Sequence, residues 1–548
     1  MSFMVVRGTP TEAQLFLDKV LGDILTAKAT RPGVERPEDV NLVEIIYYCM
    51  RTKPNAIHMI NGATGDKFTN EQILKRAVSI ARAYRSIGAS GKTVVSLLRN
   101  HEHMAAFYYG MLLAGVISYS LEPSTSGEDL QYFITVARPC MVLCEAAHRD
   151  DVTNALLQTG VAADVVVADA ASIDEFTYGH SRELDSFELP NVGPEATALM
   201  LNTSGSTGRP GTVLLSHGGL IPQLPYRWVE GSKYPHPTSL VLHLTTGQWL
   251  SHAKLMNSCP VYRVPLLVSP TCTPNTPEKV VHLVEAYRPT YTFTNIYMAV
   301  ALANMMSREQ LSCFEMLGIA GTPYTEEDIS RLKEKFDKSI LIVNNYGITE
   351  MHGALAITTR NSPLGSVGEF HNFVHYKIVN VESGEEILEP NVRGELYLKS
   401  KYVIKGYLNN DRHLNVTPDG WVKTGDVFYK DEDGHMYFAY RRTLGFKSFN
   451  KTVYPEEVEM VVGSVPGVQQ CVVCGADAGP AVAVVLRPGC DVTRDQIHHA
   501  VNSKLSDHKR LRGGIAFVEA LPRTHNGKIN RNKCLQLVKD LISTGECF

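Results

Sequence analysis

The segment Leu201–His217, which reads LNTSGSTGRPGTVLLSH, is the stretch whose residue types most directly suggest chemistry. Glycines free the backbone so that successive N–H groups can turn inward, and such a loop can wrap a polyphosphate. The segment is not a Walker loop, because it lacks the glycine–lysine–serine/threonine end of that motif. Taken by itself, this composition is more typical of a surface turn. The residues that suggest phosphate binding are Thr203, Ser204, Gly205, Ser206, Thr207, Gly208 and Gly211.

Four further short motifs follow along the chain. They read YGITE at residues 346–350, GSVG at 365–368, TGD at 424–426 and PRTHNGKI at 522–529. One such match would be weak evidence, but five in order span nearly the whole chain. Together they resemble the motifs of the adenylate-forming superfamily. The pattern is most similar to the acyl- and aryl-CoA ligases of the 4-coumarate–CoA ligase and luciferase-like group.

This resemblance implies a two-step reaction on a small-molecule carboxylic acid. The acid attacks the α-phosphorus of ATP to give an acyl-adenylate and pyrophosphate, and a thiol, commonly that of CoA, then displaces AMP. A carboxylate that approaches a triphosphate is repelled, so the site must supply positive charge and a metal. The resemblance therefore implies ATP, Mg²⁺ and CoA, and no obligate protein partner can be read from the residues.

The resemblance also assigns roles to individual residues. Lys528 is the predicted adenylation residue, because an ammonium between the carboxylate and the α-phosphate gains most in the transition state. Thr349 and Glu350 are the predicted phosphate and Mg²⁺ contacts, with Glu350 as the metal ligand. Asp426 would accept the ribose hydroxyls, and Arg441 would donate nearby. The other predicted ATP contacts are Thr203, Ser204, Gly205, Ser206, Thr207, Gly208, Gly321, Thr322, Pro323 and Tyr346.

The acid and thiol sides of the site are less clearly marked. His243 and Gly247 fall where the resemblance implies the acyl pocket, and Lys447 and Asn450 fall on the implied CoA side. The segment from Gly247 to Pro260 mixes aromatic, basic and apolar residues, which does not indicate a long alkyl tunnel. We therefore expect a medium-chain or aryl acid.

Three departures from the superfamily pattern leave other functions open. Gly211 stands in place of the usual loop lysine, Thr443 in place of Asp or Lys, and Asn450 in place of a glycine. They motivate a second hypothesis, a degenerate relative that binds nucleotide or acyl ligand without turnover. A luciferase-like monooxygenase ranks lower, because Leu244 replaces the second histidine of that group. Transfer of the acyl group to a carrier protein instead of free CoA also stays open.

Strand-like and helical segments alternate through the first four-fifths of the chain and must position these residues. Apolar runs such as residues 93–98, 139–144, 164–168 and 239–244 predict strands. The alternation predicts an α/β fold of parallel sheets covered by helices. We expect a large N-terminal AMP-binding domain over residues 1–440, a hinge at 441–443 and a small mobile α+β lid domain over 444–548.

Composition excludes several other classes of protein. Lys and Arg number 53 against 57 Asp and Glu, which leaves a net charge of −4. This balance argues against electrostatic capture of nucleic acid or of an anionic membrane. The sequence holds no apolar run of membrane-spanning length and no recognisable secretory or peroxisomal signal, so we expect a cytoplasmic protein. Cys471 and Cys474 lie in a predicted core strand, where residues three apart face opposite sides.

Overall fold

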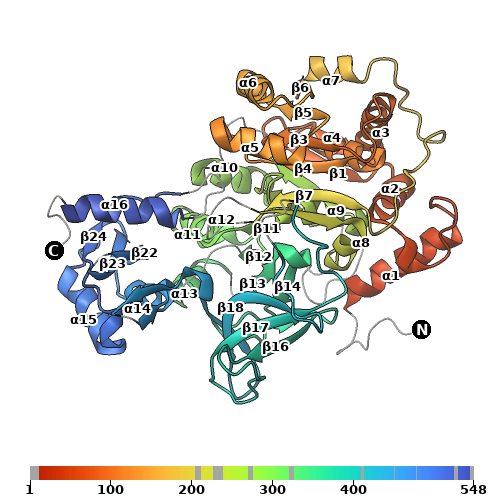
Figure 1. Cartoon of the computed structure of the whole chain (residues 1–548). Helices are drawn as coiled ribbons and strands as arrows, with labels where there is room; N and C mark the ends of the chain where they lie inside the picture. The colour runs from red at the N-terminus through yellow and green to blue at the C-terminus, as the bar shows by residue number, and fades with distance from the viewer. Residues whose placement is uncertain are drawn as a thin grey trace.

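The computed structural model describes residues 11–203, 211–225, 239–269, 276–319, 326–337, 339–408, 413–449, 451–476, 478–523 and 529–543. Figure 1 shows a larger part built of sheets layered with helices, and a smaller part, drawn in blue, formed by the C-terminal residues. The mixed α/β architecture with a large N-terminal and a small C-terminal part confirms the predicted fold class.

A six-stranded sheet forms the first layer of the larger part. Its strands lie in the order β6-β5-β3-β4-β7-β8, and all neighbours are parallel except β7 and β8. Three of the strands confirm the segments predicted around residues 95, 142 and 166. The strands are β3 (Thr93–Leu97), β4 (Ile117–Ser120), β5 (Met141–Cys144), β6 (Asp164–Val167), β7 (Thr197–Asn202) and β8 (Thr212–Ser216).

A nine-stranded sheet forms the second layer. Its order is β15-β14-β13-β12-β11-β9-β10-β1-β2, with parallel pairs in the middle and antiparallel pairs at both edges. The strands are β1 (Ile57–Asn61), β2 (Lys67–Thr69), β9 (Val241–His243), β10 (Leu266–Val268), β11 (Tyr291–Thr294), β12 (Met316–Ile319), β13 (Leu341–Ile348), β14 (Gly353–Ile357) and β15 (Glu369–Phe370).

Helices cover these sheets, and their ends carry ordinary signals. Asn41 caps α2 in a reciprocal pair with Glu44, and α4 ends at Gly115, whose φ is 71°. The helices are α1 (Glu12–Thr26), α2 (Leu42–Thr52), α3 (Asn70–Ser86), α4 (Met104–Ala114), α5 (Gly127–Ala137), α6 (Arg149–Thr159), α7 (Ala170–Phe176), α8 (His217–Leu220), α9 (Leu250–Tyr262), α10 (Pro277–Tyr287), α11 (Ile296–Met305), α12 (Arg308–Leu311) and α13 (Glu326–Lys335).

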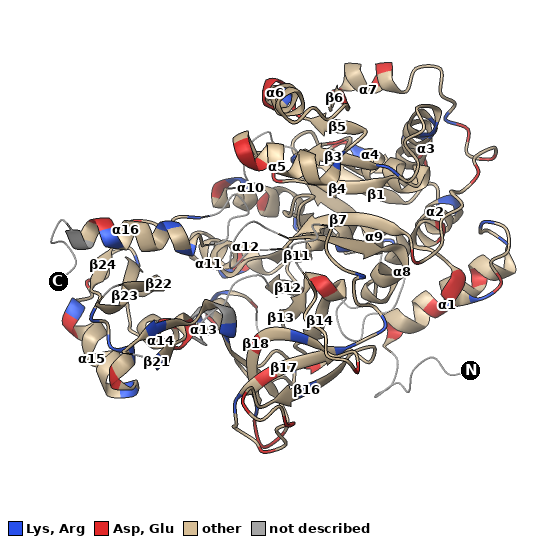
Figure 2. Ribbon diagram, in the orientation of Figure 1, with Lys and Arg blue, Asp and Glu red and all other residues tan. Residues whose placement is uncertain are grey.

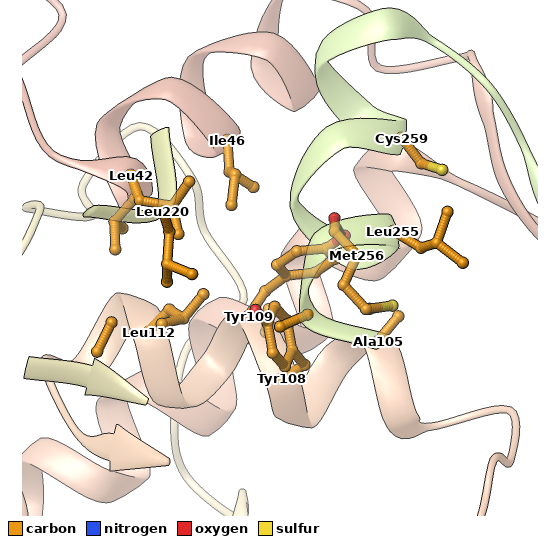
Figure 3. Packing of buried hydrophobic residues seen from close by; sticks show 14 of the residues in the cluster. Leu42, Ile46, Ala105, Tyr108, Tyr109, Leu112, Leu220, Leu255, Met256 and Cys259 are labelled. Carbon is orange, nitrogen blue, oxygen red and sulfur yellow. Dashed lines mark hydrogen bonds between the residues drawn. The ribbon is translucent and has the colours of Figure 1, made fainter. Parts of the chain in front are cut away.

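The helices α4 and α9 pack between the two sheets in the largest hydrophobic cluster. Figure 3 shows Tyr108 and Tyr109 of α4 beside Met256 of α9. Both tyrosine hydroxyls are satisfied inside the core, because Tyr109 donates to the Met256 carbonyl at 2.6 Å and Tyr108 to Asn257 Oδ1 at 2.8 Å. The two tyrosine rings pack among apolar side chains while their hydroxyls bond to α9. These bonds satisfy polar groups of α9, which is buried although it carries several polar side chains.

A four-stranded antiparallel sheet differs from the prediction of parallel sheets through the first four-fifths of the chain. Turns and loops, without an intervening helix, connect its strands among the described residues, and such connections favour antiparallel neighbours. The strands are β16 (His375–Val379), β17 (Gly394–Lys399), β18 (Val422–Lys430) and β19 (Met436–Arg441).

The described strands after Arg441 pair only with one another. Cys471 and Cys474 lie within one of these strands, as predicted. The elements are β20 (Phe446–Ser448), β21 (Lys451–Val453), β22 (Val468–Ala476), β23 (Gly479–Leu486), β24 (Ile515–Phe517), α14 (Pro455–Gly463), α15 (Arg494–Lys504) and α16 (Arg531–Ser543). The hinge itself stays a prediction.

Charged side chains of both signs are mixed over the surface. Figure 2 shows acidic and basic residues interspersed along α6 and α16. Among the helices that the structure describes, none is both long and apolar enough to cross a membrane.

Candidate active site

The base of the predicted phosphate loop is closed by backbone contacts. Thr203 follows β7 and Gly211 precedes β8. The Thr203 N–H donates to the Gly211 carbonyl at 2.8 Å, and its hydroxyl donates to the same oxygen at 3.2 Å. The two strands therefore hold both ends of the loop in one place. The loop residues Ser204 to Gly208 lie outside the described residues.

Glu350 lies in a short 3₁₀ turn, η4 (Thr349–Met351), between β13 and β14. The Tyr407 hydroxyl donates to Glu350 Oε1 at 2.7 Å. Tyr407 in turn pairs with Val213 of β8, directly after the loop, and the neighbouring Leu408 N–H donates to the Thr212 carbonyl. Tyr407 thus connects the predicted metal ligand with the base of the predicted phosphate loop. The sequence had not indicated this residue.

The donor set around Glu350 fits a magnesium ion that arrives with ATP. Among the described residues, no group of three or more His, Cys, Asp and Glu side chains gathers to form a protein metal cage. Mg²⁺ is commonly held by one or two carboxylates, with substrate phosphates and water completing its coordination. In such a site the protein would contribute one carboxylate, that of Glu350, beside the predicted phosphate loop.

Asp426 is the centre of a second polar cluster. Its carboxylate is fully buried and pairs in bidentate fashion with Arg441, with Nε–Oδ1 at 2.7 Å and a terminal nitrogen to Oδ2 at 3.0 Å. The pair forms because Asp426 and Arg441 are register partners on β18 and β19. The Tyr346 hydroxyl of β13 donates to Asp426 Oδ2 at 2.8 Å. Three predicted ATP contacts from three strands therefore meet.

The surroundings of this cluster raise the pKa values of Tyr346 and Arg441. Burial, reinforced by the Asp426 charge and hydrogen bond, raises the pKa of Tyr346 well above its usual value. Burial acts to lower the pKa of Arg441, but the attraction of Asp426 outweighs it and raises that pKa overall. A neutral phenol and a permanent guanidinium therefore face one carboxylate, which suits hydrogen bonding to a sugar hydroxyl.

The two residues predicted for the acyl pocket, His243 and Gly247, pack against other parts of the larger domain. His243 ends β9, is fully buried, and its Nε2 lies 2.9 Å from Nδ1 of His252 on α9. Burial lowers the pKa of His252 to about 4, so the His252 ring is uncharged at neutral pH. Gly247 packs against β4, where a Cβ atom would lie 2.8 Å from Ser120 Oγ. This glycine permits a close approach of two layers.

The sequence did not indicate His352, a buried polar residue two positions after Glu350. His352 is buried and receives the Ser216 N–H at Nε2, 3.0 Å away, while its Nδ1 lies 2.9 Å from the Tyr402 carbonyl. The ring fills the space beside Gly219, where any Cβ would overlap it. The lysine of α9, Lys254, lies against Gly353. In the sequence, the feature that could have drawn attention to this region was Lys254, a charged residue inside the buried helix α9.

The remaining predicted residues are only partly described. Lys447 lies on β20, and its Nζ donates to Thr452 Oγ1 at 2.9 Å. The segment that carries Lys528 is flanked by Arg523 and Ile529, which pair with each other, and the Arg523 guanidinium lies 4.5 Å from the ring centre of Tyr297 on α11. Outside the described residues lie Gly321, Thr322, Pro323, Asn450 and Lys528.

Two more contacts join the C-terminal part to the larger one. Arg393, just before β17, forms an ion pair with Glu457 of α14 at 2.5 Å. The rings of Tyr440 and Tyr454 stack with their centres 3.9 Å apart. Together with Arg523 on Tyr297, these contacts hold the small part beside α11 and the antiparallel sheet.

Comparison with known proteins agrees with this geometry. Residues 48–408 match the AMP-binding enzyme family, and residues 457–528 match the AMP-binding enzyme C-terminal domain. The chain is 26% identical to 4-coumarate–CoA ligase-like 9 of Arabidopsis thaliana, over 88% of this chain and 87% of that protein. It is 24% identical to luciferin 4-monooxygenase of Nipponoluciola cruciata, over 90% and 93% of the two chains.

A solved structure shows the same fold. ATP-bound MatB from Rhodopseudomonas palustris superposes with a TM-score of 0.79 at 22% identity, covering 92% of this chain and all of that one. The two family models place the chain in the adenylate-forming superfamily. Since the family model spans more than half of the chain, this chain belongs to the AMP-binding enzyme family.

Proposed function

We propose that this chain is an AMP-forming acid–thiol ligase that activates a carboxylic acid as its adenylate and transfers the acyl group to CoA. The observation that carries the proposal is the pair of polar clusters near the C-terminal end of β13, one around Asp426 and one around Glu350. In the proposal, the Asp426 cluster accepts hydrogen bonds from the ribose, and the Glu350 cluster holds the metal ion that binds the phosphates. Family membership supports the same reaction class.

In this proposal each described residue has a positional task. Asp426 accepts from the ribose, and Tyr346 and Arg441 orient its carboxylate through their hydrogen bonds. Glu350, fixed by Tyr407, would hold Mg²⁺, which when bound neutralises charge on the phosphates. Lys528 bridges the attacking carboxylate and the α-phosphate. The N–H groups of the loop after Thr203 bind the phosphates, although Gly211 supplies no ammonium there.

The test is acid-dependent pyrophosphate release across short, medium, long and aromatic acids. Wild type is compared with Lys528→Ala and with the matched control Lys539→Ala, an exposed lysine on α16. We expect release in wild type and control and a loss of about 10- to 150-fold in Lys528→Ala, because a charge-assisted contact in the transition state is removed. Addition of CoA should then yield a thioester.

A degenerate, non-catalytic relative is the second candidate, favoured by Gly211, Thr443 and Asn450. ATP binding in calorimetry without pyrophosphate from any acid would select it. The similarity to a luciferin 4-monooxygenase keeps a third candidate, and light emission on addition of luciferin would select that one. A thioester formed on a phosphopantetheine carrier but not on free CoA would change only the proposed acceptor.

A further inference from the structure

A lysine is buried in a helix directly below the candidate active site. Lys254 is 3% exposed on α9, in which every residue from Ser251 to Tyr262 is buried. Removing an ammonium from water is costly unless it gains strong partners. An apolar residue would fill this position at lower cost in a structural helix. A retained cation therefore calls for a ligand or a specific polar framework.

The ammonium of Lys254 is aimed by a neighbouring amide. The Gln223 side chain is also 3% exposed, and its Nε2 donates to the Ala354 carbonyl of β14 at 3.0 Å. This bond turns the amide oxygen the other way, where it accepts from Lys254 Nζ at 2.5 Å. Two segments some thirty residues apart thus fix one charged group.

The tip of Lys254 lies against the segment that carries Glu350. Any Cβ on Gly353 would overlap the Nζ and Cε atoms of Lys254, so the lysine end passes over the bare Cα of this residue. Gly353 follows Glu350 by three positions, and α9 follows directly on His243 and Gly247. The lysine therefore belongs to the helix that follows the predicted acyl-pocket residues, and its tip contacts the segment just after the predicted phosphate and metal contacts.

Among the described residues beside Lys254, two are buried histidines. His371 is 5% exposed, and burial, with the Lys254 charge, lowers its pKa to about 3, so its ring is neutral at physiological pH. The Ser216 N–H at Nε2 of His352 is consistent with a neutral ring that carries its proton on Nδ1.

We propose that Lys254, oriented by Gln223, selects an acid that carries a second carboxylate besides the reacting one. This inference rests on the proposed acid activation and names its substrate class as dicarboxylic acids, aliphatic or aryl. An ammonium has three N–H donors, so the second carboxylate adds to the contacts of Lys254 or exchanges with one of them. A neutral acid of equal length cannot make this charge-assisted contact.

The experiment compares matched pairs of acids, benzoate with terephthalate and hexanoate with adipate. For each pair, kcat/KM for pyrophosphate release and affinity by calorimetry without ATP are measured. The proteins are wild type, Lys254→Met, Gln223→Leu and the control Lys92→Met, which changes an exposed lysine. Urea unfolding verifies that each variant is folded, and Gln223→Leu serves if Lys254→Met is not.

We expect wild type and Lys92→Met to prefer the diacid, and Lys254→Met to lose this preference by about 10- to 150-fold, the range for a hydrogen bond to a charged group. Gln223→Leu should lose a smaller part. Equal use of neutral acids and diacids by wild type, or an unchanged preference in folded Lys254→Met, overturns the inference. Diacid-selective binding that depends on Lys254, without pyrophosphate release, supports the inference while contradicting the proposed ligase function.

Discussion

The nucleotide side and the acyl side of the candidate site are built in different ways. Around Asp426, opposite charges lie on adjacent antiparallel strands and meet as register partners. Around Lys254, a single cation is held by a neutral amide and flanked by neutral imidazoles from distant segments. The first cluster joins opposite charges on two neighbouring strands, and the second joins side chains from segments that lie far apart in the chain.

This difference has a chemical reason. The nucleotide is a fixed ligand, so its partners can be short motifs whose geometry one strand pair guarantees. The acid would vary, and the side chains proposed to meet it come from helix α9, the segment around Gln223 and the segment after Glu350. Tertiary packing, and no local motif, decides which side chains meet there.

The largest effect is expected from Asp426→Ala. Arg441 and Tyr346 would each lose a partner, and breaking a largely buried pair costs about 3 kcal/mol of unfolding free energy, at the low end of its range because Arg441 is partly exposed. ATP affinity should fall by about 100-fold as well. Urea unfolding and ATP calorimetry measure the two losses. The exposed Asp433→Ala should change neither by more than about 0.5 kcal/mol, and an equal loss there would contradict the account.

A smaller effect is expected where the acyl side depends on packing. Gly219→Ala should lower the unfolding free energy by about 2 kcal/mol, because the added Cβ overlaps the His352 ring. Gly22→Ala is the opposite control, since it lies in α1 with open space around it and should stabilise by about 0.5–1 kcal/mol. Thermal or urea unfolding separates the two signs. Stabilisation by both substitutions would mean that His352 is not packed as described.

A third effect depends on pH. Burial raises the pKa of Glu122, beside Gln248 on the acyl side, to about 7, although Arg99 opposes the shift. The folded state therefore binds more protons than the unfolded state between about pH 4.5 and 7, so ionisation of Glu122 lowers stability as pH rises. Glu122→Gln should gain stability relative to wild type between about pH 5 and pH 8. Urea unfolding across this range measures the difference, and a pH-independent difference would refute it.

Sequence motifs brought together more residues on the predicted nucleotide side than on the predicted acyl side, for physical reasons. Tyr346, Asp426 and Arg441 are in contact because strands β13, β18 and β19 bring them together, and their role in nucleotide binding stays a prediction. Tyr407 escaped notice, since its contact with Glu350 depends on a bridge to β8 far away in the chain.

The fold shows a similar limit. The parallel strands followed from apolar runs separated by helices, as with β3 and β5. The antiparallel sheet β16–β19 did not follow, because its long loops carry no periodic signal. Lys254 and Gln223 could not be paired from sequence at all, since an amide thirty residues away becomes a neighbour only after α9 is packed.

The lone pairs of one carboxylate set a limit on nucleotide binding. Asp426 has about four acceptor positions, and Arg441 and Tyr346 already fill three with their N–H and O–H donors. A ribose that offers two hydroxyls brings the number of donors to five, so at least one existing donor must yield. Arg441 is the last residue of β19, from which the chain leaves for the C-terminal part. In the proposed site, a ribose and Arg441 thus compete for the carboxylate of Asp426. Ribose binding would therefore act on the residue at which the chain leaves for the C-terminal part.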